Sequence, residues 1–430
     1  MRLIACLSLL MTGLLVGVSH FGVKAQLFGL SAALLLATVL TLMIFRLNDT
    51  KQLKIRHILF LAVALRVLSC FALPILENDF YRYLWDAYRF ATTGTPYGAA
   101  PTHYLFDANL PTAFREILGN INYPNIPTIY GPVTELLFLV GYGLVPAKVG
   151  ALQALNALLD IGLIALLARL GAQPRWLLLY AISPLVLKES VMTAHPDLLV
   201  GMFAIASLVA AKRAHWAGGL MGLAIASKVA ALVLLPFLVF RFGWRGLLWC
   251  GLTLLCCYVP FMWQPGSEFF ALQTFATVWR FNPLLFALIE GVTRPEYARA
   301  SAAGLLALVL AWVAWCEWKR HKKACVDNLA KVNVPPADLA LGALLAFAPV
   351  INPWYLLWFL PFAVLRPTRT AWAASLVVPL SYWHGGNFAF EGGREFGVPV
   401  LVTVFELLVL TICFIWDRRK PLYPRKDALE

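Results

Sequence analysis

Long apolar runs recur along almost the whole chain, separated by short and often basic links. A helix of about 20 apolar residues is long enough to cross the hydrocarbon core of a bilayer. Backbone inside a bilayer has no water to bond, so such runs cross it as helices rather than as separate strands. Residues 31–45 and 304–315 also lack the period-two alternation of a membrane barrel. The sequence therefore predicts an all-α, polytopic membrane protein.

Composition and charge agree with this fold class. Of the 430 residues, 61% are hydrophobic and only 13% are charged, whereas soluble chains are roughly a quarter charged. The net charge of +13 arises from basic residues in the links, for example at 46–56, 319–323 and 418–426, which is the bias of cytoplasmic loops. We therefore expect no nucleic-acid partner. The eight cysteines form no CxxC pair, which argues against a disulfide scaffold or a zinc site.

We expect a single integral membrane domain over residues 1–430 with about 12–14 transmembrane helices. The first apolar run follows Arg2 and is compatible with a cleaved signal peptide, but a second run begins at once near Leu27, which favours a retained hairpin. The predicted spans lie approximately at 3–19, 26–45, 57–75, 132–147, 150–169, 176–191, 197–211, 217–240, 246–262, 299–317, 337–350, 353–366, 370–384 and 397–416.

The basic links predict the orientation. If 46–57, 318–336 and 417–430 are cytoplasmic, then 76–131, 263–298 and 385–396 face the other side, which we expect to be the periplasm or exterior of a bacterial inner membrane. Basic residues flank 217–240 at both ends, and a broken hairpin with its tip near Ser227-Lys228 would place both basic groups inside. It would also put His195-Pro196-Asp197 outside; the crossing direction between Lys148 and His195 stays open.

Residues 76–131 form a long outer segment, and segments of that length are usually functional or disordered. Its many aromatic residues indicate that it packs. A helix here would be amphipathic and would lie at the membrane surface, ending at Gly94. Its polar face would carry Asp79, Arg82, Tyr83 and Asp86, with Arg89 one turn beyond, and its apolar face Phe80, Leu84, Ala87 and Ala91.

Two interpretations of this helix remain open. Asp79–Arg82 and Asp86–Arg89 can be ordinary intrahelical salt bridges. Alternatively, a carboxylate beside the membrane can take the proton of an incoming hydroxyl group, as a general base does.

Several short motifs carry a family resemblance. They are NDFYRYLWDA at 78–87, GTPY at 94–97 with Pro101, PTIYGP at 127–132, YAISPLVLKE at 180–189, HPD at 195–197, Lys228 with LPF at 235–237, and NPWY at 352–355. Together they resemble integral-membrane glycosyltransferases of the GT-C class, and among these the polyprenyl-phosphate-mannose-dependent mannosyltransferases of glycosyltransferase family 87. The resemblance implies a GT-C-like fold and makes Asp79 the catalytic base.

The chemistry of a lipid-linked donor suggests further site residues. The chain has no DxD motif of the kind that binds a nucleotide sugar through a metal, and a donor used outside must cross the bilayer on a lipid carrier. Arg82, Arg89, Lys228 and Arg280 are candidates for holding its phosphate. The other candidate substrate-binding residues are Tyr83, Asp86, Tyr130, His195, Asp197, Asn352, Tyr355 and His384. Glu77 and Asp79 could hold a divalent cation, but we expect no metal and no cofactor.

Each candidate has a structural alternative. Lys228 lies in an apolar stretch, where a charge is costly and often functional, but its side chain can also reach an interface. Arg280 can be an interfacial anchor, and HPD at 195–197 can cap a helix. Buried structural ion pairs are the alternative for Arg66, Glu135, Asp160 and Glu406.

The sequence thus predicts an enzyme that transfers a hexose, expected to be mannose, from a polyprenyl-phosphate donor to a lipid or glycan acceptor at the outer face, with inversion. Besides these substrates, membrane lipids are the expected partners. A non-catalytic transporter or lipid flippase is the alternative, although the chain shows no second half that matches the interrupted helix at Lys228.

Overall fold

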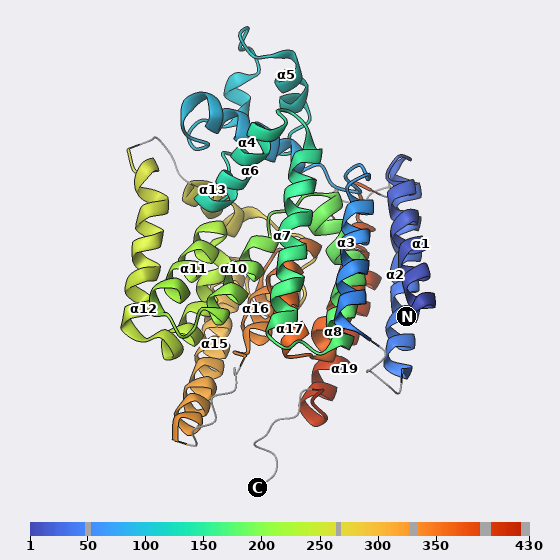
Figure 1. Cartoon of the computed structure of the whole chain (residues 1–430). Coiled ribbons are helices and arrows are strands. Elements are labelled where there is room, and N and C mark those ends of the chain that lie inside the picture. Colours follow the sequence, from blue (N-terminus) through green and yellow to red (C-terminus); the bar gives the residue numbers. More distant parts are fainter. Residues whose placement is uncertain (48–52, 264–267, 327–333, 388–396, 423–430) are drawn as a thin grey trace.

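The computed structural model describes residues 1–47, 53–263, 268–326, 334–387 and 397–422. These residues form helices and contain no strand; a single isolated bridge pairs Phe281 with Val350. The predicted all-α fold class is confirmed. Figure 1 shows a bundle of long helices with a group of shorter helices, α4 and α5 among them, at one end.

Five helices in the described residues are long and apolar enough to cross a membrane by length and composition. They are Val23–Arg46, Val149–Arg169, Val239–Phe261, Pro295–Arg320 and Val400–Arg419. The shorter apolar helices are α1 (Arg2–Val18), α6 (Pro132–Leu144), α10 (Leu198–Val209) and α16 (Ala337–Phe347). The chain is a polytopic membrane protein, as the sequence predicts.

The five long helices belong to α2, α7, α12, α15 and α19. With these included, the other elements are α2 (Val23–Arg46), α3 (Ile55–Ser69), α4 (Phe80–Thr93), η2 (Pro101–Tyr104), α5 (Thr112–Gly119), α7 (Val149–Arg169), α8 (Pro174–Ile182), α9 (Pro184–Val186), η3 (Leu187–Met192), α11 (Ala214–Ser227), η4 (Val229–Leu234), α12 (Leu235–Tyr258), η5 (Val259–Phe261), α13 (Glu268–Val278), α14 (Leu285–Val292), α15 (Pro295–Val326), η6 (Pro353–Trp358), α17 (Leu360–Leu365), α18 (Arg369–Val377), η7 (Val378–Tyr382) and α19 (Val400–Arg419).

Several apolar segments that the sequence predicts as single spans are broken. The segment predicted at 176–191 contains α8, α9 and a π-helix, η3. Pro184 begins α9, and Pro353 begins η6 within the segment predicted at 353–366. A proline cannot donate a backbone hydrogen bond, so it begins a new helix more readily than it continues one.

The predicted break near Ser227-Lys228 is confirmed. Helix α11 ends at Ser227, and Lys228 has an extended backbone with φ −158° and ψ 127° before η4 begins. Gly243 then reverses the chain within α12, with φ 61°. Gly218, near the start of α11, packs against the backbone of Gly246. The backbone near Lys212–Arg213 and that near Arg241–Arg245 therefore lie at the same end of α11, away from Lys228.

The predicted amphipathic helix is present as α4 and ends at Gly94, which has φ 75°. Its surroundings differ from the expectation, because both faces contribute buried side chains, including Tyr83 and Asp86. Leu84 packs in a small core with Phe114 of α5 and Phe138 of α6. This core is separate from the large apolar cluster of the helix bundle, so α4 lies within a packed cap at one end of the bundle.

Charged residues occur both inside the bundle and at one of its ends. Inside it, Arg66 pairs with Asp160 at 2.7 Å, and the Tyr180 hydroxyl donates to the same carboxylate, so a structural ion pair explains both charges. The C-terminal ends of α2, α15 and α19 all lie at the end of the bundle opposite the cap (Figure 1). These ends carry the basic residues Arg46, Arg320 and Arg418.

Candidate functional site

Charged and aromatic side chains from distant parts of the chain meet where the cap joins the bundle. We call this group the polar cluster. It comprises Asp79, Tyr83, Tyr130, Lys188, Glu189, His195, Asp197, Lys228, Tyr355, Trp358 and Tyr382. Its members come from the start of α4, from the segment before α6, from η3 and the link after it, from the break before η4, and from η6 and η7. Seven of the predicted site residues belong to it.

Lys228 and Asp197 form the central ion pair of the polar cluster. The Lys228 ammonium donates to Asp197 Oδ1 at 2.7 Å, and the indole N–H of Trp358 donates to the same oxygen at 2.6 Å. The ammonium also lies 4.5 Å from the centre of the Tyr355 ring. Asp197 precedes α10, but its side chain makes no capping hydrogen bond. Its carboxylate is therefore directed to Lys228 rather than to the helix end, and Lys228 is held by partners instead of extending to an interface.

His195 connects α4 to this part of the cluster. Its Nδ1 lies 2.7 Å from the Tyr83 hydroxyl, and its ring stacks on Trp354 with 4.0 Å between the ring centres. Its Nε2 lies 3.6 Å from a Glu189 oxygen and has no hydrogen-bond partner among the described residues. The imidazole is thus fixed in position with one nitrogen left to accept or donate a further hydrogen bond.

Lys188 and Glu189 form a second, fully buried ion pair. The Lys188 ammonium lies 3.1 Å from both Glu189 oxygens and donates to the Tyr382 hydroxyl at 2.7 Å. Thr193 donates its hydroxyl to the backbone carbonyl of Lys188 at 3.0 Å. A buried charge is tolerated when it is paired and hydrogen-bonded. The pair therefore adds a cation and an anion to the site, and pairing offsets part of the cost of burying them.

Asp79 directly precedes α4 and is half-buried. Like Asp197 it makes no capping bond to its helix. Burial raises the pKa of the Asp79 carboxyl above its usual range, while a hydrogen bond from Asn122 and the charges of Arg82 and Lys228 oppose that rise. Asp79 thus lies within electrostatic reach of Lys228, and its side chain is free of the helix it begins.

Glu77 lies beside Asp79. Burial raises the pKa of the Glu77 carboxyl well above its usual range, and the neighbouring Asp79 carboxylate raises it further. Each of the two carboxylates therefore disfavours the ionised form of the other. Within the part of the chain that the structure describes, no group of three or more His, Cys, Asp or Glu side chains is arranged as metal ligands.

The backbone that presents His195 and Asp197 is irregular. The π-helix η3 is followed by Ala194 with φ 57°, a conformation that residues other than glycine rarely adopt. Side-chain amides of α7 hold this turn, because Asn156 donates to the carbonyls of Ser190 and His195. Single π-helical turns and strained residues are frequent at functional sites. The irregular turn therefore marks the segment that carries His195 and Asp197 as a candidate functional one.

Arg82 and Asp86 of α4 lie next to the polar cluster on its cap side. Arg82 donates to the carbonyl of Tyr123 at 3.1 Å, and one of its buried nitrogens has no partner among the described residues. Burial raises the pKa of Asp86 to about 6, opposed by the Arg82 charge and a hydrogen bond from Thr128. The Asp79–Arg82 and Asp86–Arg89 salt bridges are not among the ion pairs of the described residues; Arg89 donates instead to the Tyr104 hydroxyl at 2.8 Å.

Three predicted site residues remain, and of these Asn352 contacts a member of the cluster. Arg280 pairs with Glu290 at 2.9 Å and is 46% exposed, as an interfacial anchor would be. Asn352 precedes η6, where it contacts Tyr355. His384 follows Tyr382 by two residues and lies against Asn387, with 3.1 Å between the Asn387 amide nitrogen and His384 Nε2. A direct part in the site is therefore best supported for the members of the polar cluster.

Sequence reasoning missed Lys188, Glu189, Trp358 and Tyr382 as site residues. Lys188-Glu189 had a detectable signal, because two adjacent charges inside an apolar run are costly and usually functional. Trp358 and Tyr382 had none, since tryptophan and tyrosine are common at membrane interfaces. Their place in the site depends on contacts across 161 and 194 residues of sequence.

One comparison with known proteins gives a match. Residues 7–243, just over half of the chain, match the family model MptA_B_family, described as alpha-(1->6)-mannopyranosyltransferase, N-terminal domain. The matched region includes Asp79, Lys188, His195, Asp197 and Lys228 of the polar cluster. No curated protein and no solved structure gives a significant match.

Proposed function

Because the chain belongs to the MptA_B family of alpha-(1->6)-mannopyranosyltransferases, we propose that it moves a mannosyl group from a polyprenyl-phosphate donor to an acceptor hydroxyl outside the cell. The mannosyltransferase family expected from the sequence motifs is confirmed. A transporter or flippase, the alternative considered from sequence, has no comparable support.

The observation that carries this proposal is the placement of Asp79 beside Lys228. A transfer to a hydroxyl group needs a base for the incoming proton and a cation for the departing phosphate. Asp79 makes no bond to its helix end, and the Lys228 charge acts on it. Lys188 and Arg82 supply further positive charge nearby. These groups lie where the cap meets the apolar bundle, so a phosphate on a membrane-embedded lipid can reach them.

In the proposed step, Asp79 takes the proton of the acceptor hydroxyl as its oxygen attacks the anomeric carbon of the mannosyl group. The bond between that carbon and the phosphate oxygen breaks on the opposite side, and the phosphate leaves with the bonding electrons. Lys228 stabilises the charge that develops on it. The anomeric centre is inverted, so a β-linked donor gives an α-linked product. The family description favours the primary 6-hydroxyl of a mannoside as the acceptor.

The surroundings of Asp79 suit a general base. A raised pKa makes its carboxylate a stronger proton acceptor than an ordinary aspartate. The neighbouring Lys228 and Arg82 still favour the ionised form. His195 and Tyr83, joined at 2.7 Å, form a rigid wall against which a sugar can be oriented. The proposed step is written without a divalent cation.

The test is the substitution Asp79→Asn in the purified full chain. We expect turnover of a polyprenyl-phosphate-mannose donor to fall by at least about a hundredfold, because a general base contributes about 10²–10⁴. Donor binding should persist, since the cations remain.

Asp107→Asn is the matched control, because Asp107 lies in the same outer segment and its side chain accepts one hydrogen bond among the described residues, from the backbone N–H of Asn109. It should leave turnover unchanged. Near-normal turnover in Asp79→Asn would remove Asp79 from the role of base. If the unmodified protein transfers no mannosyl group from this donor, the proposal that the donor is a polyprenyl phosphate is wrong.

A further inference from the structure

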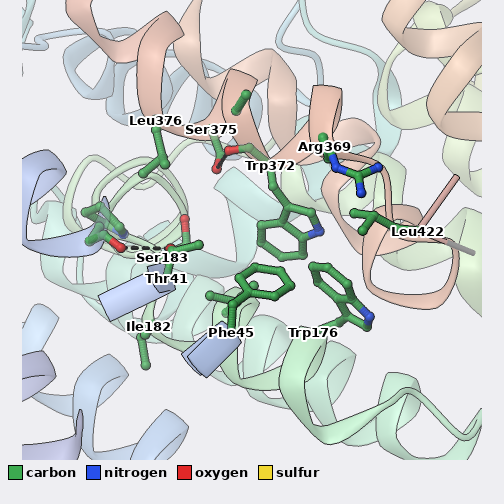
Figure 2. A pocket seen from close by; sticks show the side chains of 14 residues that line it. Thr41, Phe45, Trp176, Ile182, Ser183, Arg369, Trp372, Ser375, Leu376 and Leu422 are labelled. Atoms are coloured by element: carbon green, nitrogen blue, oxygen red, sulfur yellow. Dashed lines mark hydrogen bonds between the residues drawn. The ribbon is translucent and has the colours of Figure 1, made fainter. Parts of the chain in front are cut away.

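A cavity lies at the end of the bundle opposite the polar cluster, between α2, α8 and α18. It has a volume of about 190 Å³, which is below the roughly 300–1,000 Å³ of pockets that enclose a whole small ligand, so it can take only part of a larger molecule. Figure 2 shows Phe45, Trp176 and Trp372 gathered at its centre, with Arg369 and Leu422 on one side. The rings of Trp176 and Trp372 stack at 6.0 Å, and Phe45 meets Trp176 edge-on at 5.2 Å. The cavity is therefore walled mainly by aromatic and aliphatic side chains.

The hydroxyl groups in the cavity wall already make hydrogen bonds to the backbone of their own helices or turns. Thr41 donates to the carbonyl of Ala37, Ser375 donates to that of Trp372, and Ser183 accepts from the N–H of Val186. The indole N–H of Trp372 is different. It has no hydrogen-bond partner in the described residues, although the side chain is only 8% exposed. A buried donor without a partner is costly, so this N–H is available for an acceptor that enters the cavity.

Positive charge surrounds the same side of the cavity. Figure 2 shows the indole nitrogen of Trp372 turned toward the side where Arg369 lies. Arg175 places its guanidinium over the Phe45 ring at 5.4 Å, and its buried Nε has no partner in the described part of the chain. Arg369 is paired with Asp417 at 3.2 Å and keeps further donors. The cavity thus combines an apolar interior with a cationic, donor-rich rim.

We propose that this cavity binds an anionic phospholipid of the leaflet opposite the polar cluster. Part of an acyl chain lies among Phe45, Trp176 and Trp372, and the phosphate is bound by Arg369 and the Trp372 indole N–H. Basic pockets between transmembrane helices are suited to anionic lipid headgroups. The phosphate is the group of such a lipid that arginine binds most strongly, because both partners are ionised.

This lipid is not the sugar donor of the proposed reaction. Helix α7 runs from Gln153 and Asn156, which contact the link around His195, to Arg169 at the end near the cavity. A helix of this length spans on the order of 30 Å. A phosphate at Arg369 is therefore too far from Asp79 to take part in transfer, and the lipid serves to hold α2, α8 and α18 together.

The experiment is native mass spectrometry of the full chain in detergent, titrated with phosphatidylglycerol and, separately, with phosphatidylcholine. Ala373→Leu fills the cavity without changing any charge, since Ala373 lines it. We expect the unmodified protein to bind phosphatidylglycerol at least about tenfold more tightly than phosphatidylcholine. Ala373→Leu should lose most of that preference. Trp372→Phe, which keeps an aromatic ring in the stack and removes the N–H, should weaken the binding of phosphatidylglycerol severalfold.

Arg418→Gln is the matched control for unspecific attraction. Arg418 stacks on Trp312 and Phe414 and does not line the cavity, so phosphatidylglycerol binding should be unchanged. Equal binding in the unmodified protein and Ala373→Leu would overturn the proposal. Equal binding of the two lipids would also overturn it, and is expected if the C-terminal segment of the chain fills the cavity. Displacement of phosphatidylglycerol by equimolar polyprenyl phosphate would overturn it as well, because the cavity would then bind the carrier lipid.

Discussion

Lys228 shows how one residue can combine a structural and a chemical role. Its ammonium is only partly buried, with 18% of the side chain exposed, and it is shared between Asp197 and the Tyr355 ring. Partners of this kind compensate a positive charge in a largely apolar region. The same charge acts on Asp79. Ground-state pairing with Asp197 thus keeps a cation ready for the phosphate that leaves in the proposed reaction.

A prediction at this scale concerns pH. Lys228 lowers the pKa of Asp79, against the larger effect of burial. In Lys228→Gln the pKa of Asp79 should therefore rise, and a base must be deprotonated to act. We expect the acidic limb of the kcat/KM profile to move to higher pH, together with a fall in kcat of about 10²–10³ from the lost phosphate contact. A pH series of initial rates measures both.

Arg280→Gln is the control for this prediction. It removes a cation from an exposed pair with Glu290, so the position of the acidic limb should stay the same. If the acidic limb of the kcat/KM profile does not move in Lys228→Gln, Asp79 is not the group whose ionisation governs the rate.

Between elements, the site depends on a close contact of backbone with backbone. Gly131 precedes α6, and a Cβ atom there would lie 2.2 Å from the carbonyl oxygen of Ala226 at the end of α11. The Thr134 hydroxyl donates to the carbonyl of Ser227 at 2.9 Å. The PTIYGP motif thus fits directly onto the break that presents Lys228, which explains why a glycine occupies this position.

Gly131→Ala should therefore destabilise the protein and disturb the site. Backbone atoms cannot move aside as a flexible side chain does, so we expect a loss on the order of 1–3 kcal/mol, typical of overpacking. Thermal unfolding in detergent, read alongside turnover, measures the effect. Gly143→Ala, in the same region of chain but with no atom within 4 Å of the added methyl, should not lower stability. Equal behaviour of the two variants would contradict the role of the close contact.

Elements differed in how well the sequence predicted them. Periodicity identified α4, and the positions of the flanking basic residues identified the break at Lys228. Composition could not show that Tyr83 and Asp86, on the polar face of α4, would be buried. Helical spacing tells which residues share a face, but the partner of that face is brought in by distant segments. In this chain the partner of Tyr83 is His195, 112 residues away.

At the scale of the whole molecule, the two ends of the bundle differ in character. One end carries the cap and the polar cluster, and the other carries the basic ends of α2, α15 and α19 (Figure 1). The bias of basic residues predicts that the second end faces the cytoplasm. Arg89 and Arg280 could not be separated from Lys228 by sequence alone, because all three are cations predicted near the same face. Only the tertiary contacts distinguish them.

Labelling of intact cells with a membrane-impermeant maleimide tests this orientation. We expect Asn109→Cys, at an exposed position of the cap, to be labelled from outside above the level of the parent chain. Lys319→Cys, exposed near the end of α15, should be labelled only after permeabilisation. The reverse result would place the polar cluster in the cytosol, where a donor presented on the outer leaflet could not reach it.

The π-helical turn η3 has a consequence for how this chain can vary. Such a turn is equivalent to an α-helix that has gained one residue. Loss of one residue between Leu187 and Met192 could restore regular helical geometry without harming the apolar core. It would, however, rotate everything that follows by about 100° around the helix axis, carrying His195 and Asp197 away from Tyr83 and Lys228. The number of residues in this short stretch thus sets the direction in which His195 and Asp197 point. A variant that lacks one residue of the stretch can fold and still have no activity.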